Sequence, residues 1–261
     1  MKNYSLTKTF LILVAFGGIH TASAHIGYNG RNLGIFQGSG TELPVVISNQ
    51  SVTSDYGWAD GTDTDFGDSH KLRAFRIRLD NAAIVTIQVA GVSFSSLTAL
   101  EMPAFSLFGG LAHVSPALGD HDTSVISALW MDTTYGTGNW EGAFNALGDW
   151  KIGNDDGITF ADLSSFTYIG NAADGSSANF GSAPGISGDG NQNRSVTGTF
   201  SLAAGDYSIF VGGGLYSGSN ATTSYGFSLT ATVVPEPSTM AFIGVAFAAF
   251  LMHRLRRRRA A

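Results

Sequence analysis

Aspartates and glycines alternate in one short stretch of the chain, and their spacing suits a hard cation. Five aspartates fall within fourteen residues, interleaved with glycines that let the backbone bend: Asp55, Asp60, Asp63, Asp65 and Asp68. Calcium takes about six to eight oxygen ligands, which carboxylates and carbonyls of a bent loop supply. The alternative is a solvated loop of Asx-turns, where the same residues are common. The stretch predicts a calcium site at Asp60, Asp63, Asp65 and Asp68.

A second acidic stretch is similar to the calcium loop of EF-hand and dockerin modules. Residues 153–157 read Gly-Asn-Asp-Asp-Gly, and three of them fit positions of such a loop. Ile152 and Leu163 stand where the first and last ligands belong, so an EF-hand is not predicted. Turn residues are the alternative here as well. The candidate calcium ligands in this stretch are Asn154, Asp155, Asp156 and Asp162.

The N-terminus has the pattern of an export signal. Lys2 and Lys8 form a positive segment before the apolar stretch from Phe10 to Ile19, and Ala22-Ser23-Ala24 forms a small-residue cleavage site. Cleavage after Ala24 makes His25 the first residue of the mature protein.

A mature N-terminal histidine offers its amine and its ring to one metal ion. This is similar to the copper histidine brace of lytic polysaccharide monooxygenases, which are also β-sandwiches. The brace needs a second imidazole, a ligand that suits copper, and His70, His113 or His121 would supply it. A secreted copper enzyme acting on polysaccharide is therefore the alternative function.

Other catalytic chemistry has little support in the sequence. The chain has no cysteine, which excludes a cysteine nucleophile, a thiolate zinc site and disulfides. It also lacks a Gly-x-Ser-x-Gly elbow, a His-Glu-x-x-His motif and a phosphate-binding loop. The six aromatic residues Trp58, Trp130, Trp140, Trp150, Tyr56 and Tyr216 suit either a sugar-stacking platform or core anchors. We expect a protein that is not an enzyme.

The elements that position these residues are β-strands with long glycine-rich connections. The chain has 34 glycines and many short alternating runs, which favour an all-β antiparallel sandwich. Residues 75–79 and 84–89 are predicted to pair antiparallel through a turn at Asp80-Asn81, and 197–202 with 206–211 to form a hairpin. Residues 104–108 and 225–233 are further strands. The segment from Ser124 to Met131 fits a helix and a strand equally well.

The charge of the body argues against nucleic acid as a partner. Without the two terminal segments, residues 25–234 keep 7 basic and 19 acidic residues, a net charge of −12. Such a surface repels nucleic acids and anionic membranes and favours cations or neutral glycans.

The C-terminus combines a rigid polar motif, a short apolar segment and an arginine cluster. Residues 240–252 are uncharged and, as a helix, span about 20 Å, less than the roughly 30 Å hydrocarbon core of a bilayer. Five arginines follow, which places the preceding chain on the outer side of the membrane. Pro235 and Pro237 keep the motif extended and accessible to a protease.

This order resembles the PEP-CTERM sorting signal of Gram-negative bacteria, carried by Val234-Pro235-Glu236-Pro237-Ser238-Thr239. The resemblance implies processing near Pro235, Glu236 and Pro237 by exosortase, a membrane-embedded protease-transpeptidase. It also implies delivery to the cell surface or an exopolysaccharide matrix, after a stage with the C-terminal helix in the inner membrane.

The two predicted hairpins look like the pre-peptidase C-terminal type of domain, a small jelly-roll that accompanies secreted enzymes. The long insertion from Ala112 to Asn193 departs from that family's compact length.

The sequence therefore predicts three parts: a signal peptide (1–24), a jelly-roll-like β-sandwich (25–234) and a sorting signal with a hydrophobic helix (235–261). The expected role is binding or structural, at the envelope or in the biofilm matrix. Calcium is the expected ion, and extracellular polysaccharide is an expected partner beside exosortase.

Overall fold

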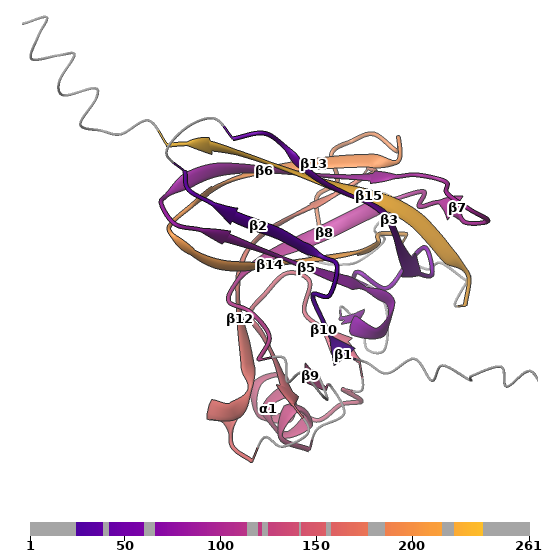
Figure 1. The fold of residues 1–261 in the computed structure, drawn as a ribbon. Helices are drawn as coiled ribbons and strands as arrows, with labels where there is room; N and C mark the ends of the chain where they lie inside the picture. Colours follow the sequence, from indigo (N-terminus) through magenta and orange to yellow (C-terminus); the bar gives the residue numbers. More distant parts are fainter. Residues whose placement is uncertain are drawn as a thin grey trace, which may run out of the picture.

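The structure, a computed structural model, describes residues 25–38, 42–59, 66–113, 120–121, 125–140, 142–154, 158–176, 186–215 and 222–236. Over these residues the chain is mostly β-structure arranged in antiparallel sheets (Figure 1), which confirms the predicted all-β sandwich. The signal peptide with Ala22 and Ala24 lies outside the described residues, as does the apolar segment over 240–252. In the described part, no helix is long and apolar enough to cross a membrane.

Two main sheets form the sandwich and one small sheet lies beside it. In spatial order, the larger sheet contains β1 (His25–Ile26), β9 (Asp120–His121), β11 (Trp150–Asn154), β12 (Ser164–Ala173), β8 (Pro103–Gly109), β14 (Gly205–Gly213), β5 (Arg73–Leu79) and β2 (Asn32–Phe36). The second sheet contains β13 (Ser195–Leu202), β6 (Ala83–Gly91), β15 (Ser224–Pro235) and β3 (Val45–Thr53), and β7 (Thr98–Ala99) pairs with β15. The small sheet pairs β10 (Ala143–Phe144) with β4 (Gly67–Asp68).

The main core lies between the two large sheets and follows from the alternation of the strands. In β5, Phe75 and Ile77 are buried while Arg76 and Arg78 are exposed. Phe75 meets Phe227 of β15 edge to face, with ring centroids 5.9 Å apart. Full burial of such a side chain contributes about 1.5–3 kcal/mol, so the facing apolar sides hold the layers together.

The two predicted hairpins are wrong, because in each case the consecutive strands lie in different sheets. β5 pairs with β2 and β14, whereas β6 pairs with β13 and β15. Each turn therefore forms an arch across the core, and the arches stack, with Leu79 opposite Gly205 in one sheet and Ala83 opposite Leu202 in the other. The end of β2 fixes the turn after β5, because the Asp80 N–H donates a hydrogen bond to the Phe36 carbonyl.

The long insertion forms a lobe at one end of the sandwich (Figure 1), and β12 runs from the sandwich into it. The undecided segment is a helix, α1 (Val125–Tyr135), and it ends at Gly136, whose φ of 95° suits glycine alone. A second core underlies the lobe on the outer face of the larger sheet. There Phe210 of β14 packs edge to face against both Phe166 and Trp150, which stack on each other with centroids 5.1 Å apart.

Candidate functional sites

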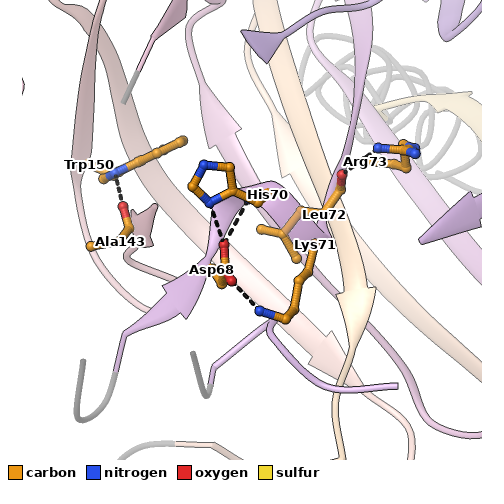
Figure 2. A network of polar contacts seen from close by, with 7 residues as sticks. All are labelled: Asp68, His70, Lys71, Leu72, Arg73, Ala143 and Trp150. Atoms are coloured by element: carbon orange, nitrogen blue, oxygen red, sulfur yellow. Dashed lines mark hydrogen bonds and ion pairs between the residues drawn. The ribbon is translucent and has the colours of Figure 1, made fainter. Parts of the chain in front are cut away.

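The clearest polar site in the described chain lies where β4 enters the single-turn helix η1 (Ser69–Lys71). Asp68 caps this turn by accepting the His70 backbone N–H at 2.9 Å. The same carboxylate accepts the His70 ring Nδ1 at 2.9 Å and binds the Lys71 ammonium (Figure 2). The preceding Gly67 has no room for a side chain, because a Cβ there would collide with the backbone carbonyls of Gly57 and Trp58. Close backbone packing thus fixes the position of Asp68.

The electrostatics of Asp68 are those of a carboxylate held ionised. Burial alone would raise the pKa of this carboxyl, but the hydrogen bonds from His70 and Lys71 and their charges outweigh it, so the pKa of Asp68 lies below its ordinary value of 3.8. Lys71 also lies over the Tyr56 ring, 5.1 Å from its centroid.

The Asp68–His70 pair can orient an imidazole for chemistry. A carboxylate bonded to Nδ1 fixes the orientation of the ring, an arrangement that metal-binding histidines commonly have. The backbone of Gly142 packs on this pair, since a Cβ there would lie 2.8 Å from His70 Cε1 and 3.0 Å from Asp68 Oδ1. The ring is therefore confined on one side.

The fold places His25 beside His121, one of the three histidines predicted as the second copper ligand. In the β1–β9 pair, His25 is opposite His121, and His121 is in turn opposite Gly153 of β11. The Cα atoms of directly opposed residues lie about 4.5–5.5 Å apart in an antiparallel pair. His113 is exposed, with its backbone N–H bonded to the Ser164 hydroxyl.

A small cavity links the chain next to His25 with the chain next to His70. Ile26 and Gly27 line one side of it, and Ser69 and Leu72 line another. The fold therefore brings together the segments that carry His25, His121 and His70, three of the four histidines considered as copper ligands.

The first predicted calcium stretch is only partly described. Asp60, Asp63 and Asp65 lie outside the described residues. Asp68 binds the Lys71 ammonium and the His70 ring, so its carboxylate has protein partners without calcium.

In the second stretch, Asn154 ends β11 with its backbone opposite Asp120, and Asp155 and Asp156 lie outside the described residues. Asp162 has a structural role, because its carboxylate accepts the N–H groups of Ile158 and Thr159 and the Thr159 hydroxyl. These bonds, the backbone bond from Thr159 first, lower the pKa of Asp162. Within the described ranges, no three His, Asp or Glu residues are placed to hold a metal ion.

The tryptophans divide between core and surface. Trp58 and Trp150 are fully buried, which confirms the interpretation of these two as core anchors. The Trp58 indole donates to Ser106 Oγ at 2.9 Å, and the Trp150 indole donates to the Ala143 carbonyl at 3.0 Å (Figure 2). Trp130 and Trp140 are only partly buried at the lobe. Tyr216 lies outside the described residues.

The sorting motif begins on the sandwich itself. Pro235 is the last residue of β15 and stands opposite Ala83 of β6. The next residue, Glu236, accepts a hydrogen bond from the Ser201 hydroxyl of β13. Pro237 lies outside the described residues.

Sequence reasoning missed the pairing of Asp68 with His70 because it assigned that aspartate to the calcium loop. The signal was present, since an aspartate two residues before a histidine suits a capped turn in which both the backbone and the ring of the histidine reach the carboxylate.

Comparison with known proteins identifies the C-terminus. Residues 233–259 match the PEP-CTERM protein-sorting motif, which confirms the resemblance predicted for this segment. No curated protein sequence matches the chain significantly. The likeness of the body to pre-peptidase C-terminal domains stays a prediction.

Two solved structures resemble this chain over most of its length. One is CorA, a surface-associated copper-binding protein important in copper acquisition by Methylomicrobium album BG8, with 13% identity and a TM-score of 0.48 over 80% of this chain and 98% of that one. The other is MopE, a secreted protein of Methylococcus capsulatus in which an oxidized tryptophan facilitates copper binding, with 14% identity and a TM-score of 0.42 over 78% of this chain and 87% of that one. At TM-scores under 0.5, these similarities indicate neither a shared site nor a shared ligand.

Proposed function

We propose that this protein is a non-enzymatic β-sandwich that works at the cell surface or in the exopolysaccharide matrix as a binding or structural component. Its PEP-CTERM motif marks an exported protein that exosortase sorts to the cell surface. The observation that carries the proposal is where this motif starts, at the final residue of an inner strand of the sandwich. Processing near Pro235 therefore detaches the folded body as one unit with almost no tail.

The body suits a role outside the cell. Two apolar cores and stacked arches stabilise it without any disulfide. Its net charge of −12 keeps it soluble and favours cations over nucleic acid.

Glycan contact is supported by a group of aromatic rings at the lobe. Phe66, Trp130 and Trp140 are partly buried, and Tyr135 is 39% exposed. The Tyr135 ring meets Phe66 at 5.1 Å and Trp130 at 5.9 Å, both edge to face. Such a group presents apolar ring surface beside polar atoms, which suits stacking against the faces of neutral sugars.

Calcium is proposed as a stabilising ion of the first acidic stretch. Asp68 and Asp162 already have protein partners, so the proposal rests on Asp60, Asp63 and Asp65, whose charges repel one another unless a cation offsets them.

The sorting role is tested by changing the motif alone. Replacing Pro235, Glu236 and Pro237 with alanines should leave an unprocessed species that stays in the membrane, measured by fractionation and intact mass. The control is Ser201→Ala, which removes the partner of Glu236 but keeps the motif and should be processed normally. Unchanged mass and location in the triple variant would refute the sorting role.

A copper site is the second candidate, and one observation favours it. The register of β1 and β9 puts His25 opposite His121, so the N-terminal residue of the mature chain has a second histidine position directly beside it. The pair would provide an amine and two imidazoles, a ligand set that suits Cu(II). His70, oriented by Asp68, lies in a segment that lines the same cavity as the chain next to His25.

Copper binding is measured by titrating the mature protein with Cu(II) and recording its electron paramagnetic resonance spectrum. One equivalent should bind with nitrogen ligands, and His25→Ala or His121→Ala should abolish this signal. His113→Ala, a matched change at an exposed histidine, should leave it intact. Oxidative cleavage of polysaccharide with added reductant would then favour the enzyme over a binding protein, whereas equal spectra for all variants would rule out the site.

A further inference from the structure

The basic residues of this acidic body are gathered at one edge of the larger sheet. Of the seven in residues 25–234, five lie at or just before β2 and β5: Arg31, Lys71, Arg73, Arg76 and Arg78. Two of them are neutralised, because Lys71 binds Asp68, and Arg78 binds Asp206 at 3.0 Å and Asp80 at 3.3 Å. In the part of the chain that the structure describes, neither Arg31 nor Arg73 forms an ion pair.

Arg31 and Arg73 line one cavity of about 30 Å³. Its other described walls come from Ile26, Gly27, Ser69, Leu72, Ala74 and Phe210, so none of the described residues that line it has a carboxylate. A water molecule needs roughly 10–15 Å³ by this measure, so the space suits a group of about two or three heavy atoms. Over the described residues, the cavity is therefore a small recess that two arginines line without a counter-charge.

Backbone carbonyls anchor both guanidinium groups without using up their donors. Arg31 donates from Nε to the Ala74 carbonyl at 2.9 Å and from a terminal nitrogen to the Gly27 carbonyl. Among the described residues, Arg73 donates to the Leu72 carbonyl alone, at 3.3 Å (Figure 2). Since each guanidinium has five N–H donors, several remain for a ligand.

The two charges also disfavour each other where they lie. Burial lowers the pKa of Arg31, and the nearby charge of Arg73 lowers it further; burial lowers the pKa of Arg73 as well. A desolvated cation without a counter-charge is unfavourable, so an anion placed between the two would be stabilised by both.

We propose that the cavity between Arg31 and Arg73 binds a carboxylate, of the kind that uronic acids present in an acidic polysaccharide. A carboxylate fits the planar guanidinium fork through two parallel hydrogen bonds, and its three heavy atoms match the size of the recess. The sugar ring would stay outside, along the edge where Arg76 and Arg78 are exposed. This extends the matrix-facing role proposed above, with an acidic glycan as the partner at this edge.

The test is a calorimetric titration of the full-length protein in mild detergent at constant ionic strength. The probes are sodium glucuronate, sodium acetate as a free carboxylate, and methyl glucoside as the neutral sugar. Arg73→Gln should weaken glucuronate binding at least tenfold, and it is the variant of choice because Arg73 makes a single long bond in the fold. Arg194→Gln removes the same charge from an exposed residue just before β13 in the other large sheet, where it pairs with Glu101, and should change binding less than twofold.

Saturable binding of glucuronate with the expected effect of Arg73→Gln supports the proposal. Glucuronate binding well above acetate identifies the sugar acid as the source, and equal binding identifies any small carboxylate. The proposal fails if the unmodified protein binds neither acid, if methyl glucoside binds as well as glucuronate, or if Arg194→Gln weakens binding as much as Arg73→Gln. The titration is independent of sorting, so its failure leaves the delivery of the protein untouched.

Discussion

Asp68 makes several contacts within the protein, whereas the sequence predicted it as a calcium ligand. Read alone, it is the last member of an acidic stretch and a candidate calcium ligand. In the fold it caps η1, holds the His70 ring and binds Lys71, while its backbone pairs with Ala143. Composition could predict that carboxylates gather here. The partners of Asp68 depend on how closely the backbone at Gly67 and Gly142 packs against neighbouring segments, and sequence spacing does not reveal this.

The first prediction concerns the stability that Asp68 provides. Asp68→Asn should lower the free energy of unfolding at neutral pH by about 2 kcal/mol, because hydrogen bonds to a charged group are lost. The folded-state pKa is below the ordinary 3.8, so this stability is fully present above pH 3.8 and is lost as the pH falls through the folded value.

Urea denaturation at several pH values measures this difference. The gap between the unmodified protein and Asp68→Asn should stay constant down to about pH 4 and narrow below it. Asp80→Asn, at a surface carboxylate paired with a 52% exposed Arg78, should cost less than about 0.5 kcal/mol. A gap that widens on acidification would contradict the assignment.

At the scale of elements, the alternation of the sequence located the strands but not their partners. Residues 75–79, 84–89, 104–108 and 225–233 all lie within strands of the structure. Alternation fits a hairpin and an arch equally, because in both cases every second side chain points to the core. The choice depends on which neighbours occupy the strand edges, and these come from distant parts of the chain, as with β2 and β14 on either side of β5.

The second prediction concerns the end of β14, where the sandwich meets the loop after β3. A Cβ on Gly213 would fall on the backbone carbonyl of Asp55, which cannot move aside as a flexible side chain would. Gly213→Ala should therefore destabilise the protein by about 2 kcal/mol or more. Gly109→Ala on β8, where a Cβ meets only ordinary contacts from 3.9 Å, is the matched control and should stay within about 0.5 kcal/mol. Equal melting curves for the two variants would show that this close approach is not required.

At the scale of the whole molecule, the sequence was most informative about where the cell delivers the protein. The C-terminal motif was predicted from residue order and is confirmed over residues 233–259. Its docking was not predictable, because the contact of Glu236 with Ser201 requires β13 and β15 to lie on either side of β6. The lobe was foreseen only as an insertion, since its core depends on aromatic contacts among residues from β8, β11, β12 and β14.

The third prediction concerns calcium and the net charge of the body. A bound ion stabilises the folded state by about 2.7 kcal/mol at a hundredfold excess over Kd. Millimolar calcium should therefore raise the melting temperature of residues 25–234 by several degrees relative to chelator. The effect should be much smaller in the variant that combines Asp63→Ala and Asp65→Ala. Identical melting curves with calcium and with chelator would refute the proposal that the protein binds calcium.

The central claim, export followed by exosortase sorting, is tested most directly by the intact mass of the protein in cells with and without exosortase. With the enzyme, the mass should correspond to a chain that begins at His25 and ends near Pro235-Glu236-Pro237, recovered from the cell surface or the medium. Without it, the chain should keep its C-terminal arginines and remain in the membrane fraction. The same mass and the same location in both strains would contradict the claim.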